Sequence, residues 1–188
     1  MNEQISLLKR YSTPAKLLVE PAPDEEQLKQ ILELAMHAPD HGRLNPYRFI
    51  SIRGEARHAL SRVFGEAVRR RDPDAHPEYL HKQMEKPLRS PLIVVVVASL
   101  IESNKIPEIE QVLSAGAAAH TILLASNAMG FGSIWLTGDH AYDEHVREAL
   151  GVEANERIVG FIYLGTEDRK LPVPDRPPVD SRILDWTG

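Results

Sequence analysis

The chain has 188 residues, 43% of them apolar and 26% charged, with a net charge of −5 and no cysteine. The mixed charges argue against nucleic acid or an anionic membrane as the main partner, and the missing thiols exclude disulfides and iron–sulfur clusters. Neither a secretory signal nor a run of about 20 apolar residues is present, so a cytoplasmic protein without a membrane partner is expected.

Two helices are predicted at the start of the chain. A short first helix around residues 5–8 cannot continue far, because Pro14 follows it. A second helix starts at the N-cap Asp24 and stops before Pro39, with an apolar stripe every three or four residues.

The middle of the chain alternates strands with helices. Strands are predicted at 48–53, 92–98, 131–137 and 158–164, and helices from Gly54 onward, at 79–85 and at 140–150. The segment 92–98 is almost continuously β-branched, which is typical of a strand covered on both faces.

The longest predicted helix, 107–129, has a second half almost without charge, which indicates burial nearly all round. Its small residues at 114–119 let another backbone come close. The proline-rich tail, about 166–188, is expected to run as an extended arm. These patterns predict one α+β domain over 1–188, with a central sheet flanked by helices. A dimer would enclose the apolar helix more easily than a monomer.

Three polar segments are candidates for a site, and the first is 9–14. Arg10 lies beside Tyr11 and Ser12, and a guanidinium with neighbouring hydroxyls suits a phosphate group. The alternative is a helix end with cations at its negative pole.

The second segment, 37–49, combines His37, His41 and Arg43 in a loop held by prolines. The two histidines have the spacing of metal ligands on a helix, but Pro39 breaks that helix and no glutamate accompanies His37. No metal site is therefore expected, and a polar loop without a role is the alternative.

In the third segment, 130–138, glycines on both sides of a short strand allow close approach to a flat ligand, and Trp135 could cover a ring. The glycine spacing is wrong for a dinucleotide fingerprint. Of the remaining histidines, His120 is expected in the core, whereas His140 and His145 are expected at the surface.

Together these segments resemble the nitroreductase family, in particular its short YdjA-like bacterial branch, over nearly the whole chain. The matching pieces are 10–12, 20–23, 38–41, 45–49, 114–116, 130–135 and 158–165. Tyr11 stands where the family usually has arginine, and Asn45 and Tyr47 stand where glutamine and tryptophan are common.

The resemblance implies a nitroreductase-like homodimer with two tightly bound FMN molecules at the subunit interface. It also implies a mixed sheet, with a strand from each C-terminal tail joining the partner. Its implied cofactor contacts are Arg10, Tyr11 and Ser12 at the phosphate and ribityl chain, Arg176 at the phosphate, Trp135, Leu136 and Thr137 along the isoalloxazine, and His37 and His41, at least one from the other subunit. Arg43 could add positive charge near the flavin.

The activity implied is an NAD(P)H oxidoreductase that reduces nitroaromatic or quinone-like small molecules by ping-pong hydride transfer through flavin N5, with NADH or NADPH as co-substrate. The flavin supplies the chemistry, so no catalytic side chain is expected. One alternative is an FMN-binding storage, sensor or flavin-processing protein without turnover. Another is an interaction module without flavin.

Overall fold

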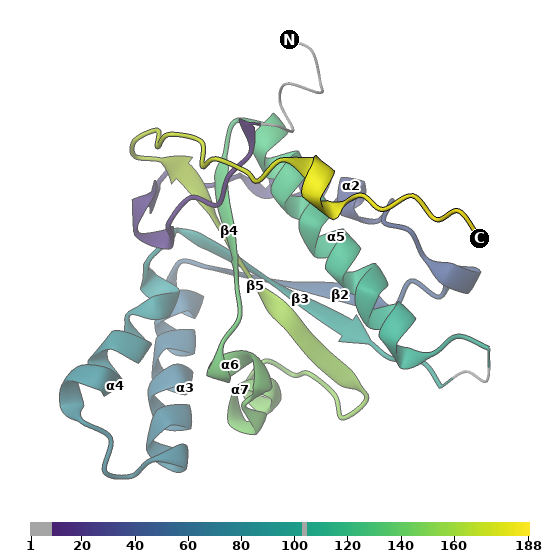
Figure 1. Ribbon diagram of the computed structural model, residues 1–188. Coiled ribbons are helices and arrows are strands. Elements are labelled where there is room, and N and C mark those ends of the chain that lie inside the picture. The colour runs from purple at the N-terminus through teal and green to yellow at the C-terminus, as the bar shows by residue number, and fades with distance from the viewer. Residues whose placement is uncertain (1–8, 103–104) are drawn as a thin grey trace.

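A five-stranded sheet forms the centre of the molecule (Figure 1). The computed structural model describes residues 9–102 and 105–188. The strands are β1 (Leu18–Val19), β2 (Tyr47–Arg53), β3 (Leu92–Ser99), β4 (Gly132–Leu136) and β5 (Glu156–Glu167). Their order is β1-β5-β3-β2, and β4 also pairs with β5. The four longer strands confirm the four predicted from the sequence.

The sheet differs from the expectation in one respect. Within the described residues of one chain every strand pairing is antiparallel, so any parallel pairing of the predicted mixed sheet would need a second chain. The outer edge of β2 is unpaired in this part of the chain, because β2 is the last strand in the order.

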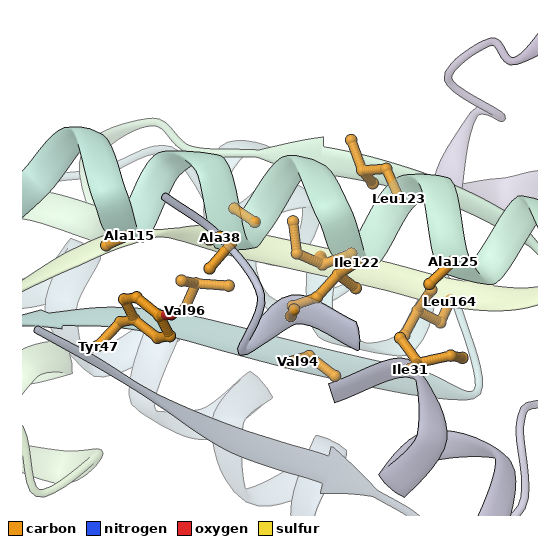
Figure 2. Packing of buried hydrophobic residues seen from close by; sticks show 14 of the residues in the cluster. Ile31, Ala38, Tyr47, Val94, Val96, Ala115, Ile122, Leu123, Ala125 and Leu164 are labelled. Carbon is orange, nitrogen blue, oxygen red and sulfur yellow. The ribbon is translucent and has the colours of Figure 1, made fainter. Parts of the chain in front are cut away.

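Helices cover both faces of the sheet, as the buried strand β3 shows by its alternation. Val94 and Val96 belong to the core on the side of α2 (Glu25–Ala35) and α5 (Glu108–Ala128), which Figure 2 shows from close by. Their neighbours Ile93 and Val95 belong to the core on the opposite side, with α3 (Glu55–Arg71). The remaining helices are α4 (Pro77–Met84), α6 (Asp139–Tyr142) and α7 (Glu144–Ala149), with short 3-10 turns at Ala15–Leu17, His41–Arg43, Lys86–Leu88 and Val179–Arg182.

Aspartates define two helix starts. Asp24 forms a capping box with Gln27, which confirms the predicted N-cap. Asp143 accepts a hydrogen bond from the Val146 N–H and therefore begins a new helix. The single helix predicted at 140–150 is for this reason two helices, α6 and α7.

The long helix α5 agrees with its predicted bounds but is not enclosed within one chain. One face is fully buried against the sheet, with Ala115, Ala118 and Ile122 inaccessible. Ile109 and Leu113 on the other face are 62% and 63% exposed. The prediction of burial nearly all round is thus wrong for a single chain.

The tail after Glu167 is extended, as predicted, apart from the 3-10 turn at Val179–Arg182. Its large apolar side chains are exposed, Leu184 and Trp186 by 93% and 89%. The helix predicted at 5–8 lies outside the described residues. None of the helices between residues 9 and 188 that the structure describes is long and apolar enough to span a membrane.

Candidate functional site

The N-terminal segment that contains Arg10 and Ser12 is fixed against the sheet. The backbone N–H of Thr13 donates to the Ser133 carbonyl of β4 at 3.0 Å, and the Thr13 hydroxyl donates to Glu167 at 2.5 Å. These bonds place residues 10–13 beside the start of β4 and the end of β5. Two of the three predicted segments, 9–14 and 130–138, are therefore neighbours.

Arg10 and Arg176 form a pair of like charges from opposite ends of the chain. Burial, and then the positive charge of Arg176, lower the pKa of Arg10. The Nη1 atom of Arg10 is buried without a hydrogen-bond partner, and neither arginine forms an ion pair with any described residue. Two guanidinium groups without a carboxylate form an arrangement that an anion would complete.

Tyr11 contacts the chain itself. Its hydroxyl accepts a hydrogen bond from the Leu171 N–H at 3.1 Å, and this bond holds the beginning of the C-terminal arm, which carries Arg176. The side chain of Ser12 is exposed in this region. An arginine at position 11 could not accept this hydrogen bond, because its side chain carries only donors.

The strand β4 turns the neighbours Trp135 and Leu136 to opposite faces of the sheet. Trp135 packs on the α5 side, where its indole N–H donates to the Val159 carbonyl at 3.2 Å and its ring covers Gly160. Leu136 packs on the α3 side, and the next residue, Thr137, is exposed. Leu136 and Thr137 therefore line the same pocket, whereas the Trp135 side chain lies on the opposite face of the sheet.

Two pockets meet at Leu136 and Arg89, which line both of them. The first has a volume of about 720 Å³ and is also lined by Ala15, Lys16, Glu85 and Leu88. The second, of about 270 Å³, continues inward past Thr137 toward aromatic side chains, and its lining comprises Phe64, Lys86, Arg89, Leu136, Thr137, His140, Phe161 and Tyr163. The pockets lie on the same part of the molecule as residues 13–16, directly after the Arg10 segment.

The inner pocket is electropositive. Burial and the neighbouring Arg89 lower the pKa of Lys86, and neither cation has a described carboxylate within ion-pair distance. Neither residue was predicted from the sequence, because both lie in the proline-containing stretch between the helix predicted at 79–85 and the strand predicted at 92–98. The available signal was their spacing of three, with Lys86 as the first residue of a 3-10 turn and Arg89 as its C-cap, since 3-10 geometry places residues three apart on one side.

His140 is buried, which corrects the surface position expected for it. Its ring stacks on Phe64 with centroids 3.8 Å apart, and Nε2 lies 3.1 Å from the Gln83 side-chain oxygen. Burial lowers its pKa to about 4, so the ring is neutral at pH 7. His145 is also less exposed than expected, with a contact to Glu66 at 2.9 Å, whereas His120 is exposed rather than in the core.

The second predicted segment, 37–49, lies in another part of the molecule. His37, His41 and Arg43 are exposed and lie near the start of α5, and His41 contacts Glu110 of its first turn. The 21 residues of α5 extend about 30 Å, and β4 follows its far end (Figure 1). Neither pocket at Leu136 includes these three residues. One chain therefore does not unite them with Arg10.

The family model described as "Nitroreductase family" matches residues 7–166. The chain is 41% identical over 168 residues to YdjA of Escherichia coli strain K12, which is assigned as an NAD(P)H nitroreductase, and the match covers 87% of this chain and 91% of YdjA.

Solved structures share the fold. A nitroreductase-like family protein from Bacillus cereus has a TM-score of 0.85 at 20% identity, covering all of this chain and 97% of that one. The FMN- and NADPH-dependent nitroreductase NfnB from Sphigopyxis sp. strain HMH has a TM-score of 0.78 at 18% identity, with both chains covered completely. Family model, sequence and fold agree, and the chain belongs to the nitroreductase family, a family of oxidoreductases.

Proposed function

We propose that the protein is an FMN-dependent oxidoreductase that takes electrons from NADH or NADPH and passes them to a small nitroaromatic or quinone-like acceptor. The observation that carries the proposal is the Arg10–Arg176 cluster, which has no carboxylate partner among the described residues. The chain runs on from this cluster to Ala15 and Lys16, which line one of the pockets at Leu136. The relatives named as NAD(P)H nitroreductases, and the FMN-dependent enzyme of the same fold, support it.

The two arginines fit the phosphate of FMN. A phosphate monoester carries close to two negative charges and offers oxygens that guanidinium groups bind in pairs. It would supply the partner that the buried Nη1 of Arg10 lacks. The exposed hydroxyl of Ser12 would bind the phosphate or the ribityl chain, and the Tyr11 hydroxyl would hold the arm that presents Arg176.

The pockets fit a flat ring next to the phosphate site. Leu136 and Thr137 would lie along the isoalloxazine, and Lys86 and Arg89 would supply positive charge. When bound, FMN supplies the hydride chemistry at its N5 atom. Fixed cations in a partly dry pocket stabilise negative charge that develops during reduction, and these two residues join Arg10, His41 and Arg43 as candidates for that role.

The homodimer predicted from the resemblance would cover the open face of α5. Ile109 and Leu113 form the apolar part of that face, and a single chain leaves them exposed. The arm with Leu184 and Trp186 is likewise uncovered, and a groove between α2 and the free edge of β2, lined by Leu28, Leu32, Met36 and Phe49, has a volume of about 560 Å³. We propose that the partner's arm occupies this groove, and that His37 and His41 approach the partner's flavin.

Steady-state kinetics test the activity. The FMN-loaded protein is expected to oxidise NADH or NADPH with a quinone or nitroaromatic acceptor and to give parallel lines in double-reciprocal plots, because donor and acceptor use one site in turn. A protein that binds FMN but shows no turnover with any such pair would instead be a flavin-storing or flavin-sensing protein. The predicted cytoplasmic location stays a prediction.

A further inference from the structure

His41 and Glu110 are joined by a short contact outside the pockets described above. The Nδ1 atom of His41 lies 2.6 Å from Oε2 of Glu110, in the first turn of α5. An ionised carboxylate can only accept a hydrogen bond, so Nδ1 carries a proton. The other ring nitrogen, Nε2, has no hydrogen-bond partner among the described residues, and the side chain is 61% exposed.

Contacts other than the one with Glu110 hold the backbone around His41. The Asn45 N–H donates to the Asp40 carboxylate at 2.6 Å, and the Ser114 hydroxyl of α5 donates to the Pro39 carbonyl at 2.8 Å. Gly42 has a φ of +75°, which favours glycine, and a Cβ atom there would displace the end of the Ile106 side chain. The loop is therefore held on α5. The imidazole ring of His41 could still rotate, and its contact with Glu110 fixes its orientation.

Glu110 is well placed to hold a ring at this point. Its carboxylate lies at the positive end of α5, where negative charge is favourable. Ile109 and Leu113, its neighbours on the helix, belong to the exposed face that the proposed dimer would cover. The His41–Glu110 pair thus lies at the end of the surface that would face the second copy of the chain.

We propose that Glu110 is a positioning residue that accepts the Nδ1 proton of His41 and so presents Nε2 to the FMN of the partner subunit. The inference rests on the proposed function, because it needs a bound flavin at the dimer interface. Glu110 acts only through His41 and does not touch the cofactor. Because the hydrogen bond at one ring nitrogen decides the protonation of the other, its removal changes both the tautomer and the direction of the ring.

Four variants separate this role from a structural one. Glu110→Ala removes the acceptor, whereas Glu110→Gln keeps an acceptor oxygen without the charge. Glu108→Ala removes an equal charge from the same helix turn, and its side chain is exposed. His41→Ala, alone and combined with Glu110→Ala, shows whether Glu110 works through the ring. Circular dichroism of each variant reports whether the fold is kept.

The readouts are the FMN dissociation constant of the full-length protein and the ¹⁵N resonances of His41 at pH 8. We expect Glu110→Ala to weaken FMN binding at least fivefold and to lose the Nδ1-protonated signal. Glu110→Gln and Glu108→Ala should stay within twofold of the parent. In the His41→Ala background, Glu110→Ala should change the affinity less than twofold.

Two results would overturn the inference while the proposed function stands. One is equal FMN affinity of Glu110→Ala and Glu108→Ala in a protein whose parent binds and reduces FMN. The other is a fivefold loss from Glu110→Ala that persists without His41. A parent that binds no FMN would contradict the proposed function itself, and this inference with it.

Discussion

Arg10 is the residue on which the flavin proposal depends most directly. Its Nη1 atom is buried without a partner among the described residues, and the neighbouring Arg176 repels it, so the site without an anion is electrostatically unfavourable. Arg10 could be predicted from the sequence by its hydroxyl-bearing neighbours Tyr11 and Ser12. It could place Arg176 beside it only through resemblance, because the two residues are far apart in the chain.

Replacing Arg10 by alanine should raise the FMN dissociation constant about 10- to 100-fold, since a hydrogen bond to a charged group is worth about 1.5–3 kcal/mol. Turnover of the fully loaded enzyme should change much less. Fluorescence titration of the apoprotein with FMN measures the effect, and Arg62→Ala, an exposed arginine of α3, is the control. Equal affinities of the two variants would remove Arg10 from the phosphate site.

Glu156 governs a pH dependence of stability. The guanidinium of Arg48, with Nε and Nη2 at 2.8 and 2.7 Å, together with the Ser99 hydroxyl, holds the pKa of this buried carboxyl at about 2 instead of 4.5. Because the folded-state pKa is depressed, the stabilisation, about 3 kcal/mol, is complete above pH 4.5 and disappears as the pH falls toward 2.

The Glu156→Gln variant should therefore have a free energy of unfolding about 3 kcal/mol lower than that of the parent at pH 7, and should unfold at a lower urea concentration. Near pH 2–3 its free energy of unfolding should approach that of the parent. Urea denaturation at a series of pH values checks this, with the exposed Glu148→Gln as the control. A difference between parent and Glu156→Gln that does not narrow in acid would contradict the assignment.

At the scale of elements, most strands and helices could be predicted from the sequence. The faces of each element that are buried determine where its apolar residues recur, and this periodicity is visible in the sequence. The nearly continuous apolar run of β3 is explained by the helices on both sides of it. The division of α6 from α7 was not predictable from periodicity, since it depends on whether the side chain of Asp143 turns back to cap the second helix.

The packing of Trp135 between β5 and α5 gives a prediction for two glycines. Gly160 lies under the indole ring with no room for a methyl group, whereas a methyl group added at Gly116 of α5 would lie 3.8 Å from the same ring, an ordinary contact distance. Gly160→Ala should cost about 1–3 kcal/mol by overpacking. Gly116→Ala should be neutral or stabilising by up to about 1 kcal/mol, as alanine favours a helix. Thermal unfolding of both variants tests this prediction. Equal midpoint temperatures of Gly160→Ala and Gly116→Ala would contradict the packing of Trp135 described here.

For the whole molecule, the candidate site divides into a part that one chain assembles and a part that it does not. Arg10, Ser12, Leu136, Thr137 and Arg176 belong to the first part, and His37, His41 and Arg43 lie near the start of α5. Hydrophobic periodicity could predict an apolar α5, but it could not tell burial within the chain from burial against a second copy, because both environments favour the same side chains.

The open face of α5 predicts the assembly state. Ile109→Glu combined with Leu113→Glu should convert a dimer into a monomer and weaken FMN binding, since charged groups cannot be buried there without a partner. Sedimentation velocity measures the first effect and fluorescence titration the second. Tyr79→Glu, on α4 and 43% exposed, should leave both unchanged. A double variant that remained a dimer would place the interface elsewhere.

The most direct test of the proposed flavin oxidoreductase function is a visible absorbance spectrum. The full-length protein is incubated with FMN and freed of unbound cofactor, and its spectrum is recorded before and after anaerobic addition of NADPH and then NADH. A function as a flavin oxidoreductase predicts a bound-flavin spectrum that bleaches with at least one of the two nucleotides. A flavin spectrum that neither nucleotide bleaches would contradict the reductase function. A colourless protein would contradict FMN binding at the Arg10–Arg176 cluster, and the proposed function with it.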